Sequence, residues 1–187
     1  MNLPRELPTE RLLLRWWKPE DRAPFYQLNA DPAVNEFLTG PLTRDESDHV
    51  ADRIETHFEQ HGFGWWAVEI SDRVPFIGFV GLSVPHYKAP FTPCVEVGWR
   101  LDRAYWGQGY ATEAARAALT FGFETLKLDE IVAMTVPAND RSRNVMEKLG
   151  MTRDPADDFD HPLLPADHRL SRHVLYRISQ QEALAQR

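Results

Sequence analysis

Apolar and polar residues alternate with a period of two in residues 95–101 (VEVGWRL). The odd-numbered positions are apolar and share one face of an extended strand, whereas Glu96, Gly98 and Arg100 share the other. Apolar residues recur instead at helical spacing within residues 45–60, and Gly62 and Gly64 follow that segment. The pattern therefore predicts a strand with one polar face, and a helix that the glycines end.

The other segments predict an order of strand, two helices, three strands, helix, strand, helix, loop and strand. We expect strands at residues 9–17, 65–70, 76–84, 95–101, 130–136 and 173–178, and helices at residues 19–29, 45–60, 109–126 and 139–150. Residues 154–169 are rich in proline and acids, which predicts irregular structure, and the last residues suggest a short helix.

Connection lengths predict the topology. Short turns make the early strands antiparallel, whereas the long helix between residues 101 and 130 implies a parallel crossover. We therefore expect one α+β domain over residues 1–187 with a mixed sheet.

Composition excludes several classes of protein. The chain has 187 residues and a formal net charge of −7, which argues against nucleic-acid binding. Cys94 is the single cysteine, so no internal disulfide forms and a reducing cytoplasm is expected. We interpret Cys94 as a small apolar residue rather than a nucleophile. No apolar run is long enough to span a bilayer, and the first residues lack the apolar core of a signal peptide.

A glycine-containing turn carries the strongest functional signal. Gly107 and Gly109 lie between the strand at residues 95–101 and an alanine-rich helical segment. Glycines at such a turn let backbone N–H groups converge, and the helix N-terminus adds partial positive charge. The turn is either an ordinary strand-to-helix connection or a main-chain cradle for the phosphates of a cofactor.

Three segments resemble one protein family, in the family's order. Residues 106–111 (WGQGYA) resemble the acetyl-CoA loop of the GNAT superfamily of N-acetyltransferases. Residues 139–142 (NDRS) and 146–151 (MEKLGM) resemble its next helix. The opening residues 9–15 (TERLLLR) resemble the Rim-type branch, which includes acetyltransferases of ribosomal-protein N-termini.

The resemblance implies a fold and a cosubstrate. It implies a single GNAT-like domain with a mixed central sheet, helices on both faces, and a splayed strand pair that holds acetyl-CoA. Two residues depart from the family pattern. Trp106 stands where the general pattern has Gln or Arg, and Met146 stands where many members have a tyrosine that protonates the departing thiolate.

The expected cofactor site follows from the resemblance. The diphosphate would lie on the N–H groups of residues 107–111, and the pantetheine arm would pair with backbone near Val97 and Trp99, with an amide near Val97 facing the carbonyl oxygen. Arg103 either approaches a phosphate or is simply exposed, and Asn139 either bonds the pantetheine arm or caps a helix. The residues expected to bind acetyl-CoA are Val97, Trp99, Arg103, Trp106, Gly107, Gln108, Gly109, Tyr110, Ala111, Thr112, Asn139 and Ser142.

Two residues are catalytic candidates. Glu96 is the candidate general base, because a carboxylate beside the cofactor can accept a proton from the incoming ammonium; the alternative is a salt-bridged or solvated strand carboxylate. Glu69 is a weaker candidate. Ser142 is the candidate proton donor to the thiolate in place of the missing tyrosine, although serine is also common in a first helical turn.

The acceptor is less defined. An aromatic wall of Phe37, Trp65, Trp66 and Tyr87 is possible, but each residue also suits core packing. The acidic residues of segment 154–169 would attract a cationic amine. Its histidines, His161 and His168, lack the same-face spacing of a metal site, because Pro162 and Pro165 separate them.

We therefore expect a cytoplasmic N-acetyltransferase that moves an acetyl group directly to a primary amine, as a monomer or homodimer. Protein N-termini rank first among the acceptors by resemblance; other peptides, polyamines, antibiotics and small metabolites stay open. The alternatives are a CoA-binding sensor without turnover and a nucleotide-binding regulator. The regulator ranks last, because no P-loop lysine follows Gly109.

Overall fold

One mixed sheet runs through the whole molecule in the computed structural model, which describes residues 3–185. Its strands are β1 (Glu6–Pro8), β2 (Leu12–Arg15), β3 (Trp65–Ile70), β4 (Val74–Ser83), β5 (Glu96–Leu101), β6 (Glu130–Thr135), β7 (Thr152–Arg153), β8 (Phe159–Asp160) and β9 (Arg172–Ser179). They lie in the order β1-β2-β3-β4-β5-β6-β9-β7, and β8 pairs with β9. Only the β5–β6 step is parallel, as the long connection predicted.

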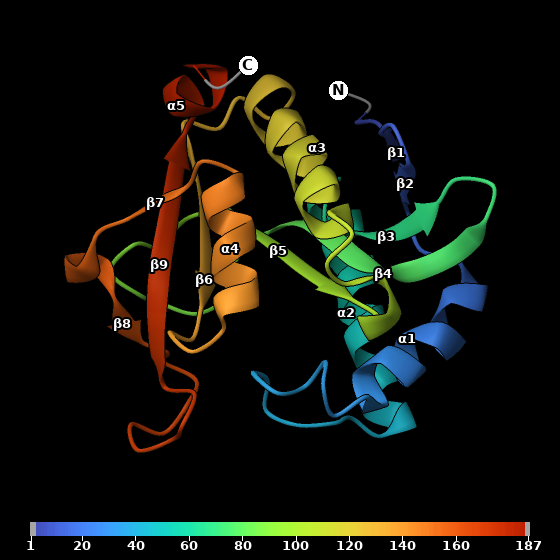
Figure 1. Cartoon of the computed structure of the whole chain (residues 1–187), viewed down its shortest axis with the longest axis horizontal. Coiled ribbons are helices and arrows are strands. Elements are labelled where there is room, and N and C mark those ends of the chain that lie inside the picture. The colour runs from blue at the N-terminus through green and yellow to red at the C-terminus, as the bar shows by residue number, and fades with distance from the viewer. Residues whose placement is uncertain (1–2, 186–187) are drawn as a thin grey trace.

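Helices cover both faces of the sheet. The α-helices are α1 (Arg22–Ala30), α2 (Arg44–His61), α3 (Tyr110–Glu124), α4 (Asp140–Lys148) and α5 (Gln180–Ala185), with single 3₁₀ turns at Pro19–Asp21, Arg103–Tyr105 and Pro155–Asp157. In Figure 1, α3 and α4 lie in front of the sheet, and α1 and α2 lie behind or below it. This arrangement confirms the predicted α+β fold with helices on both faces.

The polar face of β5 looks toward α1. Phe79 pairs directly with Arg100 across β4 and β5, so their side chains share one face, and the Phe79 ring lies 5.9 Å from that of Phe25 in α1. Another pair of the same ladder, Leu82 and Val97, faces the other way, with Leu82 packed against Gly122 of α3. Glu96 and Arg100 therefore lie on the opposite side of the sheet from α3.

The parallel strands β5 and β6 separate almost as soon as they meet. They share one bridge, between Glu96 and Val132, where the Val132 N–H donates to the Val95 carbonyl at 3.0 Å. β5 then pairs only with β4, while β6 pairs with β9 along its full length. Figure 1 shows the two strands diverging from this point, which confirms the expected splayed pair.

Most predicted elements lie within two residues of their observed bounds, and the exceptions are short strands. The segment predicted as one strand at residues 9–17 forms β2 alone, and β1 was not predicted because it has three residues and ends in a proline at the sheet edge. Segment 154–169 is also less irregular than expected, since it contains a 3₁₀ turn and β8. These two-residue and three-residue pieces are fixed by tertiary pairing rather than by local pattern.

Candidate active site

The turn between β5 and α3 presents a row of free backbone donors. Gly107 and Gly109 adopt φ values of +73° and +84°, and Gly109 forms the N-cap of α3. Within the described part of the chain, none of the six backbone N–H groups of residues 107–112 donates a hydrogen bond; the first to do so is Glu113, to Gly109 at 3.0 Å. Unpaired amides beside a helix N-terminus suit an anion with several oxygens, such as a diphosphate.

Side chains on either side hold this turn in shape. The Trp106 indole N–H donates to the Leu101 carbonyl at 2.7 Å, and the Gln108 amide donates to Ala104 at 2.9 Å. These bonds use the side chains of Trp106 and Gln108 to fold the turn back on β5. The amides of the turn are consequently fixed before any ligand arrives.

A second set of contacts that stabilises the turn comes from the residues just before β2. Arg11 donates to the Gln108 carbonyl at 3.0 Å and pairs with Glu113 at 2.6 Å, and its guanidinium stacks over Tyr110 at 4.5 Å. Thr9 also donates to Glu113, at 2.6 Å. The first turn of α3 is therefore fastened to the segment that precedes β2.

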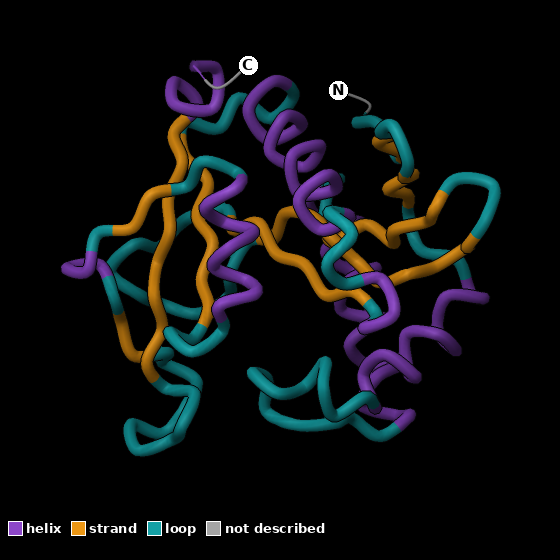
Figure 2. Tube along the Cα trace, in the orientation of Figure 1, coloured by secondary structure: helices purple, strands orange, loops and turns teal. Residues whose placement is uncertain are grey.

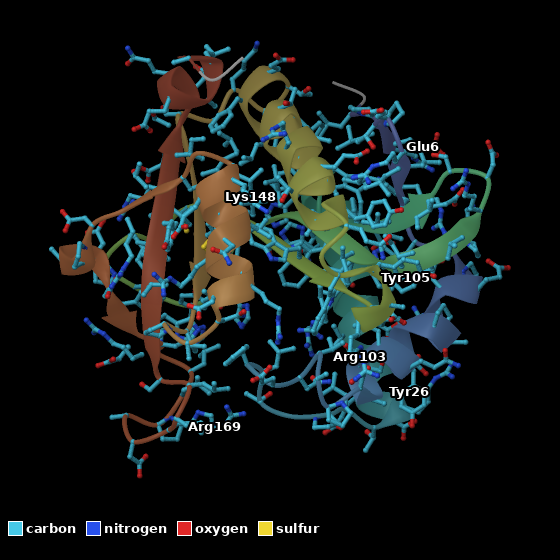
Figure 3. The ribbon with its side chains drawn as sticks, viewed as in Figure 1. Glu6, Tyr26, Arg103, Tyr105, Lys148 and Arg169 are labelled. Atoms are coloured by element: carbon cyan, nitrogen blue, oxygen red, sulfur yellow. The ribbon has the colours of Figure 1, made fainter. Side chains whose placement is uncertain are left out.

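Arg103 does not join the amide turn. Its guanidinium is 3.8 Å from Asp31 and two-thirds exposed, and it borders a shallow hollow beside the end of α1. Figure 3 shows Arg103 next to Tyr26 of that helix. The structure places Arg103 in the exposed position beside α1, and its role as a phosphate ligand stays a prediction.

Asn139 and Ser142 lie where α4 begins, across the splay from β5. Asn139 caps the helix, since its Oδ1 accepts from the Ser142 backbone N–H at 3.2 Å, and its Nδ2 donates to the Thr135 hydroxyl at 3.1 Å. The Ser142 hydroxyl is half-buried and makes no hydrogen bond with a described residue. Met146, one turn later, is buried in the core and offers no proton donor.

Glu96 lies at the bridge where the splay begins. It makes no hydrogen bond or ion pair with a described residue, and burial raises the pKa of its carboxyl to about 7. Tyr87 is close enough to feel its charge, and the Tyr87 hydroxyl donates to the Met134 sulfur at 2.8 Å. A carboxyl group that titrates near neutrality at the edge of an opening is suited to exchange protons with a ligand.

Glu69, the weaker base candidate, and Cys94, interpreted as an apolar residue, both make other contacts. Glu69 pairs with Arg15 at 2.8 Å, and Arg15 also holds Asp21 at 2.7 Å, so the Glu69 carboxylate is committed to an ion-pair network. Burial raises the pKa of the Cys94 thiol to about 11, which leaves it protonated at neutral pH. Cys94 packs beside Val132 and Phe159, as the interpretation of an apolar residue requires.

Two loops meet below the splay. The α1–α2 segment (residues 31–43) and the β8–β9 segment (residues 161–171) approach each other at the bottom of Figure 2. Arg169 donates to the Glu36 carbonyl at 3.0 Å, and Arg141 of α4 pairs with the Glu36 carboxylate at 2.7 Å. Arg141 also stacks over Trp106 at 4.5 Å, so this residue of α4 bridges the α1–α2 segment and the turn between β5 and α3.

Comparison with known proteins identifies the class. Residues 11–152 match the model of the acetyltransferase (GNAT) domain, and the chain belongs to that family. It is 32% identical over 152 residues to the uncharacterized protein YkkB of Bacillus subtilis, covering 81% of this chain and 87% of that protein. It is 27% identical to the uncharacterized N-acetyltransferase YnaD of the same organism, covering 94% and 98%.

Solved structures agree. The structure of a GNAT-family acetyltransferase from Bacillus anthracis superposes with a TM-score of 0.77 at 26% identity, covering 95% of this chain and 99% of that one. The protein is thus an N-acetyltransferase with the GNAT fold, a family that uses acetyl-CoA and amine acceptors. No helix in the described residues has the length and apolar character to cross a membrane.

Sequence reasoning did not assign roles to Arg11, Arg100 and Arg141. Arg11 and Arg141 act over long sequence separations, to Glu113 and Glu36, so no local pattern could have revealed their contacts. Arg100 did leave a signal, because the alternation in β5 places it on the same face as Glu96.

Proposed function

We propose that this N-acetyltransferase holds acetyl-CoA at the splay and transfers its acetyl group directly to a primary amine. The main support is the six backbone amides of residues 107–112. They can donate to the oxygens of a diphosphate, and they donate to no other group in the described chain. Acetyl-CoA would supply the acetyl group as an activated thioester.

The pantetheine arm would lie along the free edge of β5. Alternation along the strand directs the backbone groups of Val97 and Trp99 toward β6, and the ladder with β6 has only the bridge at Glu96. Beyond the bridge, the Val97 carbonyl and the backbone groups of Trp99 would pair with the amides of the arm, and an N–H near Val97 would face the carbonyl oxygen that gains charge. Asn139, on the opposite side of the splay, would form a further hydrogen bond with the arm.

Glu96 would act as the general base. Its carboxyl titrates at about 7, so it is substantially ionised at neutral pH and can take a proton from an ammonium group that binds beside it. The remaining task of the site is orientation, since a neutral amine held close to a thioester needs little covalent help.

Ser142 would protonate the thiolate as it leaves. Its hydroxyl is free, half-buried and located in the first turn of α4, whereas Met146 in the next turn is buried and has no proton to donate. We expect Ser142→Ala to lower kcat by roughly 10-fold without changing the affinity for CoA. A variant with unchanged kcat would mean that solvent supplies this proton.

The Rim-type resemblance of residues 9–15 makes protein N-termini the first acceptors to test, and the single cysteine suits an enzyme of the cytoplasm. The experiment has two arms: calorimetric titration with CoA, and release of CoA thiol from acetyl-CoA with a panel of peptides, polyamines and amino acids. Binding with turnover supports the proposal. Binding without turnover would favour a sensor, and an absence of CoA binding would refute the assigned loop.

A further inference from the structure

An indole N–H and a guanidinium lie on the same face of the sheet as Glu96, and neither has an anionic partner. Trp65 of β3 pairs with Gly81 of β4, which pairs with Gly98 of β5, so the three positions form a row across the sheet. A Cβ atom at Gly98 would lie 3.4 Å from the Trp65 Nε1. The two glycines thus leave room for the indole to extend over β5, between Glu96 and Arg100.

The Trp65 Nε1 is a buried donor without an acceptor. The atom is inaccessible to solvent and has no hydrogen-bond partner in the described residues. The indole is fixed by a ring contact with Phe79 at 5.2 Å, and its own backbone carbonyl accepts from Trp17 at 2.7 Å. A buried donor left unpaired costs stability, and a ligand that brings an acceptor would recover that cost.

Arg100 is a desolvated cation with a neutral partner only. Its Nη1 donates to the Asn29 Oδ1 at 2.7 Å, and the guanidinium lies 5.3 Å from the centre of the Phe79 ring. It forms no ion pair with a described carboxylate, and burial lowers the pKa of Arg100 to about 10. Most of its five donors therefore have no described acceptor.

Glu96 does not neutralise Arg100. The two residues are four positions apart on β5, a Cα separation of about 13 Å in an extended strand. No salt bridge joins them, and desolvation is the cause of both altered pKa values. Along β5 the face therefore presents a proton acceptor at Glu96, the indole N–H of Trp65 over Gly98, and the guanidinium of Arg100, in that order.

We propose, building on the function above, that the acceptor is an amine that also carries a carboxylate: Glu96 receives the amine, and Trp65 and Arg100 bind the carboxylate. A planar guanidinium matches the two oxygens of a carboxylate, and the indole N–H supplies a further donor. Free amino acids and peptides with an acidic residue beside the N-terminus share this chemistry. Both bring the anionic partner that the half-buried guanidinium lacks.

The test compares matched acceptors that differ in this group alone. The pairs are 4-aminobutyrate with butylamine, and an N-terminal Gly-Asp peptide amide with its Gly-Asn counterpart. We expect kcat/KM to be about 10- to 100-fold higher for the carboxylate of at least one pair. The pair that shows the larger ratio distinguishes a free amino acid from an acidic peptide, and equal kcat/KM within both pairs would overturn the proposal.

Two conservative variants locate the effect. Trp65→Phe keeps the ring and removes only the N–H, whereas Arg100→Gln removes the charge but keeps a donor for Asn29. Each should reduce the preference for the carboxylate, Arg100→Gln to about 1, while KM for acetyl-CoA stays within twofold. Arg100→Lys should restore part of the preference. An undiminished preference in both Trp65→Phe and Arg100→Gln would contradict the assignment.

An NMR titration tests the carboxylate subsite independently of the proposed acetyl transfer. The indole ¹⁵N–H resonance of Trp65, assigned with Trp65→Phe, should move downfield on titration with 4-aminobutyrate and remain unmoved with butylamine. This readout does not require turnover. A shift without acetylation would refute the proposed reaction but keep the carboxylate subsite, whereas acetylation without any preference or shift would refute the subsite alone.

Discussion

The two sides of the splay offer different kinds of chemical group: backbone amides on one side and side chains on the other. On the α3 side, the site is main chain: six amides of residues 107–112, with shape set by two glycines. On the α1 side, it is side chain: Glu96, Arg100 and Trp65, contributed by two strands. Under the proposed function, the main-chain side would bind the diphosphate of the cosubstrate and the side-chain side would select the amine. Cosubstrate and acceptor would then be recognised by separable parts of one sheet.

The largest effect is expected when the backbone of the turn at residues 107–112 is disrupted. Gly109→Pro fixes φ near −65°, whereas the turn requires +84°, so CoA affinity should fall by roughly 100-fold. Gly40→Ala is the matched control, because Gly40 also has a positive φ of +123° but lies in the α1–α2 segment with open space around it. Calorimetry should show unchanged CoA binding for the control. Equal affinities for the two variants would mean that the turn does not hold the diphosphate.

The second largest effect is expected when the proposed base on the α1 side, Glu96, loses its carboxylate while the turn at residues 107–112 is unchanged. Glu96→Gln should lower kcat roughly 100-fold at pH 7 while the Kd of CoA stays the same. In the wild type, kcat/KM should rise with pH through about 7 as the Glu96 carboxyl loses its proton. The pH–rate profile of Glu96→Gln should lack this rise in kcat/KM. A variant profile that overlays the wild type would transfer the role to another base or to water.

The same substitution should reveal a cost in stability. Burial raises the folded-state pKa of Glu96 from 4.5 to about 7, so the folded protein binds more protons than the unfolded chain between these values. Stability therefore falls as pH rises through this window, by up to about 3 kcal/mol. Thermal unfolding should show Glu96→Gln to be several degrees more stable than wild type at pH 8 and equal to it at pH 4. Equal Tm values at both pH values would show that the carboxylate remains well solvated.

The smallest effect is expected at Cys94, which lies near the splay but belongs to neither side. Its thiol is held protonated by burial, with a pKa of about 11, so Cys94→Ala should keep kcat within twofold. Steady-state rates with a saturating acceptor provide the measurement. A near-complete loss of turnover would indicate a covalent acyl-enzyme instead of direct transfer.

The main-chain side was easier to predict from sequence than the side-chain side. Gly107 and Gly109 indicate an unusual backbone, and the proposed binding group is that backbone, so the local motif contains most of the information. The alternation in β5 likewise predicted that Glu96 and Arg100 share a face. The pattern could not show that Arg100 lacks a carboxylate, because its neighbours, Asn29 and Phe79, come from other elements. The pairing of Glu69 with Arg15 was hidden for the same reason.

The α1–α2 segment has a consequence for how enzymes of this kind diversify. Among residues 31–43 only Asn35 is buried, and the ties of the segment to the rest of the protein include two arginines that reach Glu36 from the far side of the splay. A surface ion pair of this sort contributes little to folding. After gene duplication, mutation can therefore change this segment at little cost to folding, while the inherited sheet and the β5–α3 turn stay unchanged.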